Sequence, residues 1–358
     1  MRIAIDAREL QGRATGVGTY LSGILHEWAT LPAAASHELI LCKPDSRAGT
    51  WWEQRILPRL LRDAGADVLF APGYTTPVFA GVPTVVAIHD VSFAAHPEWF
   101  GWREGLRRRT LTRLSARRAA RVLTISEFSK REIVTHLGIA ASKVEVIYPA
   151  PSHVGRATAP HLAAAVETPP HRGSRQVVLY SGSLFNRRHV PELIDGFARL
   201  SRRLPDARLE IVGDNRTIPR IDIESLVAAS GAADRIAVRS YLPDAELSAL
   251  YREARAFVFL SEYEGFGLTP LEALRAGVPV VVLDTAVARE VYGSAPLYVD
   301  RPEPALIEAA IARVLTDDAE RARILAAGRD TLARYSWRSC AERVLNVLVS
   351  CSGCRASR

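Results

Sequence analysis

Two carboxylates frame a glycine turn in the stretch SEYEGFGLTPLEALRAGVPVV, residues 261–281. Glu264 precedes two glycines, which allow a ligand to approach the backbone closely, and a predicted helix follows them. The unpaired N–H groups and the dipole at the start of a helix favour an anion. A carboxylate beside an anion site is unfavourable unless another part of the ligand, such as a sugar hydroxyl, lies against it. The combination points to a ligand with a phosphate part and a polyol part, which is a sugar nucleotide.

Glu272 has a structural explanation as well. Thr269 in the N-cap position, Pro270 as the first helical residue and Glu272 three residues after the cap match the spacing of a capping box. Such a cap stabilises a helix by about 1 kcal/mol. The cap and a ligand would compete for the same carboxylate.

Positive groups occur where a phosphate would need them. The predicted strand QVVLYSG is followed by a loop that contains Gly182, Arg187 and Arg188 and leads into a helix. Adjacent arginines on a surface usually face solvent, which is the alternative here. Because these two follow a strand end, they are candidates for neutralising a diphosphate leaving group.

Two further candidates lie in the first half of the chain. Gly16 and Gly18 stand between a predicted strand and a predicted helix, but Leu21 occupies the place of the third glycine of a dinucleotide fingerprint. They can admit a phosphate or an acceptor, or they form an ordinary helix start. His89 ends the strand PTVVAI and is followed by Asp90; it is either a hydrogen-bonded structural residue or a catalytic one.

The elements that must position these residues are short apolar strands that alternate with amphipathic helices. Strands with both faces covered read as continuous apolar runs, so the pattern predicts parallel sheets flanked by helices. Ligands of such sheets bind at the carboxyl ends of the strands. The predicted strands are 2–6, 38–42, 67–71, 83–88, 121–125, 144–148, 176–182, 207–213, 235–241, 256–260 and 278–283.

The strand pattern occurs twice in 358 residues, with a Pro- and Ala-rich interruption between the copies. The predicted fold class is therefore α/β, with two doubly wound Rossmann-like domains that face each other across a deep cleft. We place the domains at residues 1–165 and 166–335, followed by a last segment at 336–358.

Composition favours some partners over others. The formal charge is +7, and residues 101–121 hold eight arginines against one acid. This segment is either a solvated helix face or a surface for anionic lipid or a phosphorylated acceptor. No interleaved aromatic motif points to nucleic acid. The pattern shows no membrane span and no signal peptide, so we expect a cytoplasmic protein. We interpret the CSGC at 351–354 as an incidental pair of cysteines.

The stretch around Glu264 resembles the Glu-x7-Glu signature of the retaining family-4 glycosyltransferases, the group 1 enzymes with the GT-B architecture. Nearly the whole chain takes part in this resemblance. Matching segments follow in the order of the family: TGVGTY, VVAIHDVSF, LTISEFSKREI, VEVIYPAPS, LYSGSLFNRRHVPELIDGF, LEIVGD, SYLPDAELSALYREARAFVF, LDTAVAREV and YSWRSCAERVL.

The resemblance implies a role for each candidate residue. The first domain would bind the acceptor and the second the nucleotide sugar, and the last helix would cross back onto the first domain. Glu264 would contact hydroxyls of the donor sugar, Glu272 the ribose, and His89 the reaction centre. Arg188, with Arg187, would bind the diphosphate. The loop with Gly16 and Gly18 would also approach the donor phosphate and the acceptor. The backbone of the turn would hold sugar and diphosphate through Gly265, Phe266, Gly267, Leu268 and Thr269.

Two departures from the family pattern concern these roles. Where the family often has Arg-Lys-Asn, this chain has Arg187, Arg188 and His189, and Ser183 replaces an arginine within the turn. Arginine keeps the charge of lysine but changes the geometry of the donors. Thr19 replaces a basic residue after the GVG loop, which bears on the acceptor side.

The expected reaction is transfer of a hexosyl group from a nucleotide sugar to a glycan or polyprenyl-diphosphate-linked acceptor, with retention and without a metal or other cofactor. The opening of the chain and IHDVSF resemble mannosyl-transferring members of bacterial surface-polysaccharide pathways, which favours GDP-mannose as donor. Two alternatives remain at this point. One is a nucleotide-sugar epimerase of similar shape, and the other is an NAD-dependent oxidoreductase based on the GVG loop.

Overall fold

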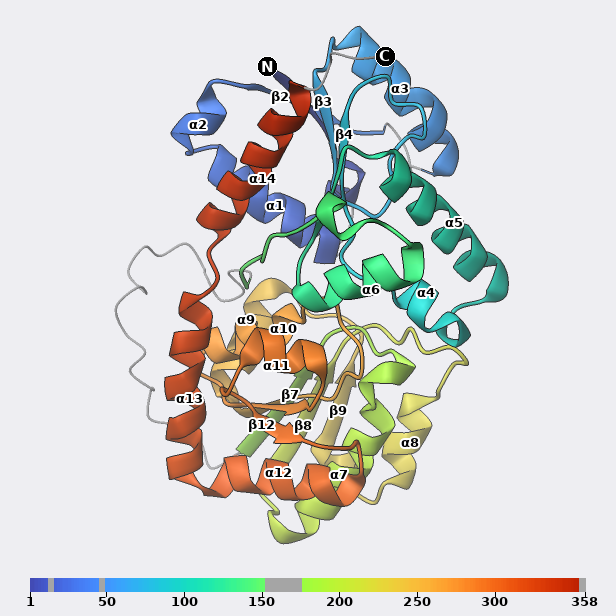
Figure 1. The fold of residues 1–358 in the computed structure, drawn as a ribbon. Helices are drawn as coiled ribbons and strands as arrows, with labels where there is room; N and C mark the ends of the chain where they lie inside the picture. Colours follow the sequence, from blue (N-terminus) through green and yellow to red (C-terminus); the bar gives the residue numbers. More distant parts are fainter. Residues whose placement is uncertain (12–15, 45–48, 152–175, 354–358) are drawn as a thin grey trace. The chain divides into compact units, whose positions relative to one another are not determined.

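The protein consists of two compact units, seen in a computed structural model that describes residues 1–11, 16–44, 49–151 and 176–353 (Figure 1). Unit 1 contains Met1–Ala150 together with Tyr335–Arg358, and unit 2 contains Pro151–Arg334. The domain boundary placed at residue 165 from the sequence lies outside the described residues. The segment that returns to unit 1 begins at Tyr335, one residue before the position assigned from the sequence.

Unit 1 is built on a parallel six-stranded sheet in the order β2-β1-β3-β4-β5-β6. All six strands predicted in this part of the chain are confirmed. The central strands β3 and β4 are buried along their whole length, which explains why their sequences are continuous apolar runs. The strands are β1 (Arg2–Asp6), β2 (Glu38–Cys42), β3 (Val68–Ala71), β4 (Thr84–Ala87), β5 (Arg121–Thr124) and β6 (Val144–Val146).

Unit 2 has a second parallel six-stranded sheet, in the order β12-β11-β10-β7-β8-β9. Five of its strands were predicted, and the edge strand β12 was not. That strand has only three residues, two of them half-buried, so it leaves no apolar run in the sequence. The strands are β7 (Gln176–Ser181), β8 (Ala207–Val212), β9 (Ile236–Arg239), β10 (Ala254–Phe259), β11 (Val280–Leu283) and β12 (Leu297–Val299).

Helices connect the strands in both units. Those of unit 1 are α1 (Gly16–Trp28), α2 (Pro32–Ala35), α3 (Leu57–Asp63), α4 (Ser92–Ala95), α5 (Trp102–Arg118), α6 (Glu127–Leu137) and α14 (Trp337–Ser352). Those of unit 2 are α7 (Val190–Arg203), α8 (Ile223–Ala229), α9 (Asp244–Glu253), α10 (Leu268–Arg275), α11 (Ala286–Tyr292), α12 (Pro304–Thr316) and α13 (Asp318–Ala333).

The last helix, α14, packs against α1 within unit 1. The Trp28 indole donates a hydrogen bond of 2.9 Å to the carbonyl of Ala341. The Trp337 ring lies so close to Gly23 that a Cβ there would be 2.6 Å from it, so this crossing requires glycine. Helix α14 is thus part of the core of unit 1.

Each sheet has one switch point. There the chain, having added strands on one side of the first strand, begins to add them on its other side. In unit 1 this point lies between β1 and β3, and in unit 2 between β7 and β10. Ligands of doubly wound sheets bind in the crevice at the carboxyl ends of the two strands that flank such a point. A ligand-binding site is therefore expected in the loops after β1, β3, β7 and β10.

Candidate active site

The two loops at the switch point of unit 2 are joined by their backbones. The 3-10 turn Asn186–Arg188 (η5) follows β7, and residues 260–267 follow β10. The amide of Glu262 donates to the carbonyl of Arg187 at 2.9 Å, and Arg187 Nε donates to the carbonyl of Tyr263 at 3.1 Å. The Arg187 guanidinium also lies 4.3 Å from the centre of the Phe185 ring. Arg187 is therefore fixed by the opposite loop rather than extended into solvent.

Arg188 and Glu264 form an ion pair between the same loops. Arg188 Nε and Nη2 lie 2.8 and 2.7 Å from Glu264 Oε1, and the side chains are 12% and 16% exposed. Arg188 Nη1 donates to the carbonyl of Ser183 at 2.8 Å, and the guanidinium lies over the Phe259 ring. Burial alone would lower the pKa of Arg188, but the Glu264 carboxylate outweighs it and the pKa is raised. Arg188 is charged at any physiological pH.

This pair differs from the separate contacts that the sequence suggested. The residue expected at the diphosphate and the residue expected at the sugar are bound to each other, 76 positions apart in the chain. A ligand that enters here meets a buried positive group and a buried negative group side by side. Such a pair suits a ligand with an anionic part next to a hydroxylated part.

Gly182 allows the Arg188 side chain to fold back over the loop. Its φ is +136°, and a Cβ at this position would lie 2.9 Å from Arg188 Nη1. A glycine at the end of β7 therefore has a specific function here, as the sequence suggested, although the function is close approach to an arginine of the same loop.

The helix after the second loop begins earlier than the capping box predicted. α10 begins at Leu268, with Gly267 as N-cap at φ +84° and ψ 76°. Thr269 is the second residue of the helix, and its buried Oγ1 has no hydrogen-bond partner among the described residues. The prediction of Thr269 as N-cap and Glu272 as its capping-box partner is therefore wrong.

A tertiary contact explains this shift. The Tyr292 hydroxyl, from the end of α11, donates to the carbonyl of Gly267 at 2.8 Å and approaches that of Phe266 at 3.4 Å. With the Phe266 side chain buried, the turn is fixed before the helix starts. Gly265 is buried in the same turn, and Leu268 and Thr269 are half-buried.

Glu272 is buried one turn into α10 and is released from the capping role. Burial and, secondarily, the charge of Glu272 raise the pKa of Tyr251, whose hydroxyl is buried. Glu272 is thus a buried carboxylate that acts on the buried Tyr251 hydroxyl through its charge.

Sequence reasoning missed two polar residues of this site. The Ser261 hydroxyl donates to Glu264 Oε1 at 2.8 Å, and Tyr292 holds the turn described above. Ser261 stands three residues before Glu264, a spacing that indicates a local side-chain bond and was present in the sequence. Tyr292 had no comparable signal, because its partner lies 25 positions away.

His189 adds an ion pair beside the arginines. This residue, at φ +50° before α7, places Nδ1 3.2 Å from Glu192 and Nε2 2.5 Å from Glu262. Burial lowers the pKa of His189, but hydrogen bonds and charge from Glu192 and Glu262 outweigh it and raise the pKa. His189 thus joins the two loops through contacts that favour its protonated form.

We expect this contact to make stability depend on pH. Because the pKa of His189 is raised above its ordinary value of 6.5, its contribution is complete below pH 6.5 and is lost as pH rises through the raised value. Urea unfolding of the wild type and of His189→Asn between pH 5.5 and 9 measures it. The difference in unfolding free energy should be largest at pH 5.5. A difference that grows with pH would contradict the assignment.

His89 is buried at the switch-point edge of unit 1. Nε2 lies 2.7 Å from the carbonyl of Pro72, and since a carbonyl can only accept, Nε2 carries a proton. Burial lowers the pKa of His89, so the ring is neutral near pH 7 and Nδ1 is an acceptor. Tyr20 of α1 packs edge-on against this ring at 4.8 Å.

Gly16 and Gly18 lie in the first turn of α1 rather than in a loop before it. Gly16 is its first residue and is exposed, while Gly18 is buried. No described atom lies within 4 Å of a Cβ built at Gly16. Within unit 2 the structure brings together Gly182, Arg187, Arg188, Glu264 and the 265–269 turn, and within unit 1 it brings α1 next to His89.

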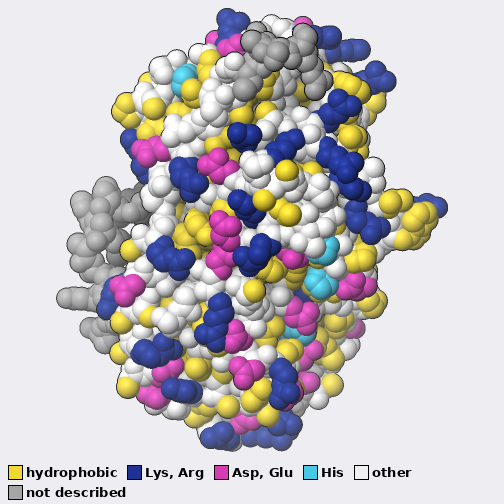
Figure 2. Space-filling model, in the orientation of Figure 1, with side chains coloured by type: hydrophobic (Ala, Val, Ile, Leu, Met, Phe, Trp, Pro, Cys, Tyr) yellow, Lys and Arg dark blue, Asp and Glu magenta, His cyan; other side chains and the backbone are white. Residues whose placement is uncertain are grey.

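The arginine-rich segment forms a continuous helix, α5, with basic side chains along one edge of unit 1 in Figure 2. Glu104 pairs with Arg107 and Arg108, whose hydrogen bonds hold the pKa of that carboxyl at about 2. Trp102 and Leu106 are 72% and 50% exposed on the same helix. The edge therefore combines cations with large apolar side chains.

Two general features complete the description. No group of three or more His, Cys, Asp or Glu residues is placed to hold a metal in the part of the chain that the structure describes. Over the same residues, no helix is both long and apolar enough to cross a membrane. Of the CSGC pair, Cys351 is buried in α14, and Cys354 lies outside the described residues.

Two sequence models of known families match most of the chain. Residues 25–150 match the model described as Glycosyltransferase Family 4, and residues 165–331 match the model described as Glycosyl transferases group 1.

Individual proteins show the same similarity. O-antigen chain mannosyltransferase B of Escherichia coli is 29% identical over 73% of this chain and 69% of its own length. GDP-mannose:cellobiosyl-diphosphopolyprenol alpha-mannosyltransferase of Xanthomonas oryzae pv. oryzae is 27% identical over 62% of this chain, but this match spans only 54% of that protein. The crystal structure of Anabaena HepE in complex with UDP-glucose is 19% identical, with a TM-score of 0.74 over 98% of this chain and all of that one.

Proposed function

Because this chain belongs to the group 1 glycosyltransferases of family 4 and has their GT-B fold, we propose that it transfers a hexosyl group, with mannose favoured, from a nucleotide sugar to a glycan. The acceptor is a free or polyprenyl-diphosphate-linked glycan of bacterial surface polysaccharide synthesis. Transfer retains the configuration at the anomeric carbon and needs no metal. Unit 2 binds the donor and unit 1 the acceptor, in the cytoplasm or at the inner face of the membrane.

The observation that carries this proposal is the buried Arg188–Glu264 pair at the switch point of unit 2. A donor diphosphate competes with Glu264 for the Arg188 guanidinium, because phosphate oxygens accept the same bidentate pattern. Glu264 is then released toward the hydroxyls of the sugar. One exchange thus supplies contacts to both parts of the donor, and we assign the ribose to Glu272 and a second diphosphate contact to Arg187.

Charge stabilisation follows from the same groups. The sugar carbon becomes positive as the bond to the diphosphate breaks, and negative charge accumulates on the leaving phosphate. Arg188 and the N-terminal amides of α10 stabilise the phosphate, so its departure needs no divalent cation. Glu264 stabilises the positive charge on the sugar. The neutral His89 accepts, at Nδ1, a hydrogen bond from a hydroxyl of the reacting sugar.

Retention is proposed to occur by attack on the face from which the diphosphate leaves. The acceptor oxygen bonds to the anomeric carbon while its proton passes to the departing phosphate oxygen. A covalent intermediate on Glu264 is disfavoured, because Oε1 still accepts a hydrogen bond from Ser261 after Arg188 has turned to the diphosphate, and this bond reduces its nucleophilicity. Determining the anomeric configuration of the product by NMR tests retention directly.

The choice of donor is tested by binding and transfer together. A mannose donor is supported by the names of the Escherichia and Xanthomonas relatives. GDP-mannose at 100 times its dissociation constant should add about 2.7 kcal/mol to stability and raise the melting temperature, with UDP-glucose and NAD as comparison ligands. Stronger protection by another nucleotide sugar would reassign the donor. Transfer that is unchanged by EDTA is expected, and its loss would overturn metal independence.

An epimerase remains the alternative to distinguish. Incubation with the nucleotide sugar alone should leave the sugar unchanged or slowly hydrolysed. Accumulation of an isomerised nucleotide sugar without transfer to any acceptor would refute the transferase proposal. The family assignment leaves the NAD-dependent oxidoreductase without support.

We also propose that α5 binds an anionic membrane. Arg103 lies over the Trp102 ring at 5.2 Å, and Leu106 follows one turn later, so apolar and cationic groups alternate on one exposed face. Such a face binds anionic head groups by charge and inserts a few apolar side chains.

The membrane proposal predicts a specific binding pattern. The protein should sediment with vesicles containing phosphatidylglycerol and not with neutral phosphatidylcholine vesicles. Trp102→Ser combined with Arg103→Gln should weaken this binding at least several-fold, since each surface cation contributes about 1 kcal/mol. Arg202→Gln with Arg203→Gln on α7 removes two charges elsewhere, against one in the first variant, and serves as control. Equal loss in both double variants would contradict a specific role for α5.

A further inference from the structure

The loop after β3 contains a backbone conformation that side chains rarely adopt. Tyr74 has φ +65°, and the amide of Thr75 donates to the carbonyl of Gly73 at 2.7 Å across it. This is a three-residue turn with positive φ at its centre, which is strained for any residue other than glycine or asparagine. Strain of this kind costs about 1–3 kcal/mol and persists only where surrounding contacts enforce it.

The Tyr74 side chain contacts two residues of the loop that follows β4. Its hydroxyl donates to Asp90 Oδ2 at 2.9 Å, and its ring packs edge-on against His89, with 5.6 Å between centroids. Asp90 Oδ1 accepts a second hydrogen bond, from the amide of Ser92. Pro72, two residues before Tyr74, supplies the carbonyl that accepts from His89 Nε2. One loop thus fixes both His89 and Asp90.

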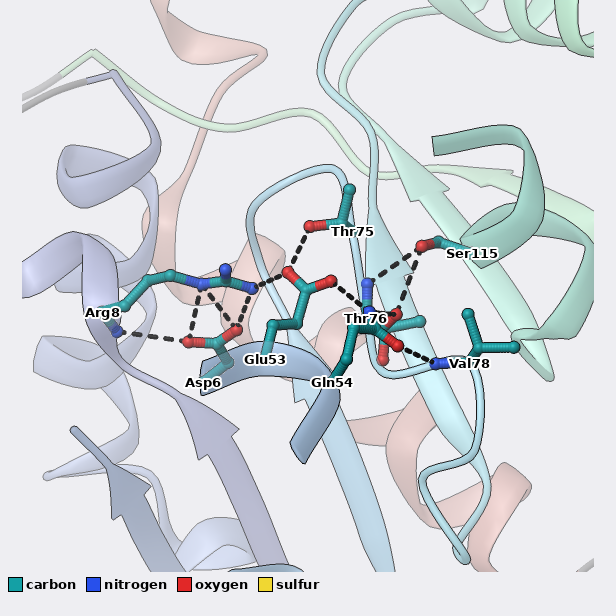
Figure 3. Close-up of polar contacts among 8 residues, drawn as sticks. All are labelled: Asp6, Arg8, Glu53, Gln54, Thr75, Thr76, Val78 and Ser115. Atoms are coloured by element: carbon teal, nitrogen blue, oxygen red, sulfur yellow. Dashed lines mark hydrogen bonds and ion pairs between the residues drawn. The ribbon is translucent and has the colours of Figure 1, made fainter. Parts of the chain in front are cut away.

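A network of polar side chains holds this loop from the other side (Figure 3). Thr75 Oγ1 donates to Glu53 Oε2 at 2.5 Å, and Arg8 Nη2 reaches the same oxygen from β1's end. The neighbouring Gln54 bonds the carbonyl of Thr76 and the amide of Val78. The residues of the loop that follow Tyr74 are therefore fixed by bonds between side chains and their backbone.

Charge in this network is concentrated and buried. Arg8 lies between Asp6, which is 2% exposed, and Glu53, also 2% exposed, and is itself bonded to both. A protein with such a buried triad is often no more stable than one with well-packed apolar residues in its place. We therefore infer that the triad positions the loop rather than stabilises the fold. Glu53 lies in the short π-helix Trp52–Ile56, a rare conformation that is frequent at functional sites.

From these contacts we propose that Tyr74 is a positioning residue for His89 and Asp90, held in its strained turn by the Arg8–Glu53–Thr75 network. The inference rests on the proposed transferase function, because it gives His89 a place at the reacting sugar. Tyr74 acts by setting the orientation of His89. The loop lies at the switch point between β1 and β3, where a small displacement changes the geometry of the site directly.

The test is removal of one hydroxyl. Tyr74→Phe keeps the ring and deletes the bond to Asp90, and kcat should fall about 10- to 100-fold while KM for the donor stays within about twofold. Glu53→Gln, which weakens the hold on Thr75, should shift kcat in the same direction. Tyr148→Phe is the matched control: it deletes the hydroxyl of a half-buried tyrosine of the same unit whose ring packs on Tyr335, and kcat should not change.

A second readout separates this inference from the proposed function. NMR signals of the His89 ring protons should move in Tyr74→Phe and stay in place in Tyr148→Phe. If the wild type transfers no sugar, the proposed function fails, and the His89 signals still test the positioning. Wild-type kcat together with unmoved His89 signals in Tyr74→Phe would overturn the inference.

Discussion

Glu264→Gln should lower the rate of sugar transfer by about 100- to 1,000-fold while the nucleotide sugar still binds. The amide has nearly the shape of the carboxylate, and its oxygen still accepts from Arg188 and Ser261. It lacks the negative charge that stabilises the sugar carbon as the bond to the diphosphate breaks. Single-turnover kinetics for transfer and calorimetry for donor binding measure the two effects separately. Near-normal transfer would show that Glu264 is structural.

The ion pair of Arg188 and Glu264 should also contribute to the free energy of unfolding. Glu264→Leu leaves the guanidinium of Arg188 buried without its counter-charge, which should cost about 3–5 kcal/mol in urea unfolding. Arg188→Met combined with Glu264→Leu should recover much of this loss. The exposed Arg2–Glu38 pair is the control, and breaking it should cost less than about 1 kcal/mol. Equal costs at both pairs would mean that Glu264 and Arg188 do not interact in solution.

Gly267→Ala should destabilise the protein by about 2–3 kcal/mol and weaken donor binding. The backbone at Gly267 has φ +84°, where an alanine is strained, and its Cβ would lie 2.1 Å from the Tyr292 hydroxyl. Tyr292 is buried and bonds the carbonyl of Gly267, so moving it also costs a hydrogen bond of about 1 kcal/mol. Thermal unfolding with and without nucleotide sugar measures both losses.

Gly16→Ala provides the contrast. Because no described atom lies within 4 Å of the added Cβ, folding should be unaffected. If the start of α1 approaches a phosphate or an acceptor, this variant should lose activity without losing stability. Unchanged activity would remove Gly16 from the site. An effect of Gly267→Ala no larger than that of Gly16→Ala on stability would refute the role assigned to Tyr292.

The architecture was largely predictable because burial on both faces of a sheet leaves a direct pattern in the sequence. Runs such as VLFA at 68–71 and VVVL at 280–283 are apolar at every position and are buried at every position. β12 escaped prediction because an edge strand of three residues is covered on one side only. The start of α8 has a local cause of the same readable kind, because the carboxylate of Asp222 at its N-cap accepts from the amide of Ser225 three residues later.

Contacts between distant residues limited what the sequence could show of the site. The spacing of Thr269 and Glu272 satisfies a capping box, yet Tyr292 fixes the turn one step earlier and Gly267 becomes the cap. The residues Arg188 and Glu264 were both identified, but not their mutual bond. For Tyr74, a positive φ at a tyrosine has no local signal at all, because the network that enforces it comes from β1, the π-helix and α5.

The return of α14 to unit 1 has a consequence for synthesis on the ribosome. Trp28 bonds to a residue 313 positions later, and Gly23 lies against Trp337, so the first unit lacks part of its core until the second has been made. Unit 2 is continuous in the chain and can fold as soon as residue 334 has emerged. The half of the protein that is translated first is therefore expected to be completed last, and a nascent chain stopped before Tyr335 should expose the Trp28 side of α1 to chaperones and proteases.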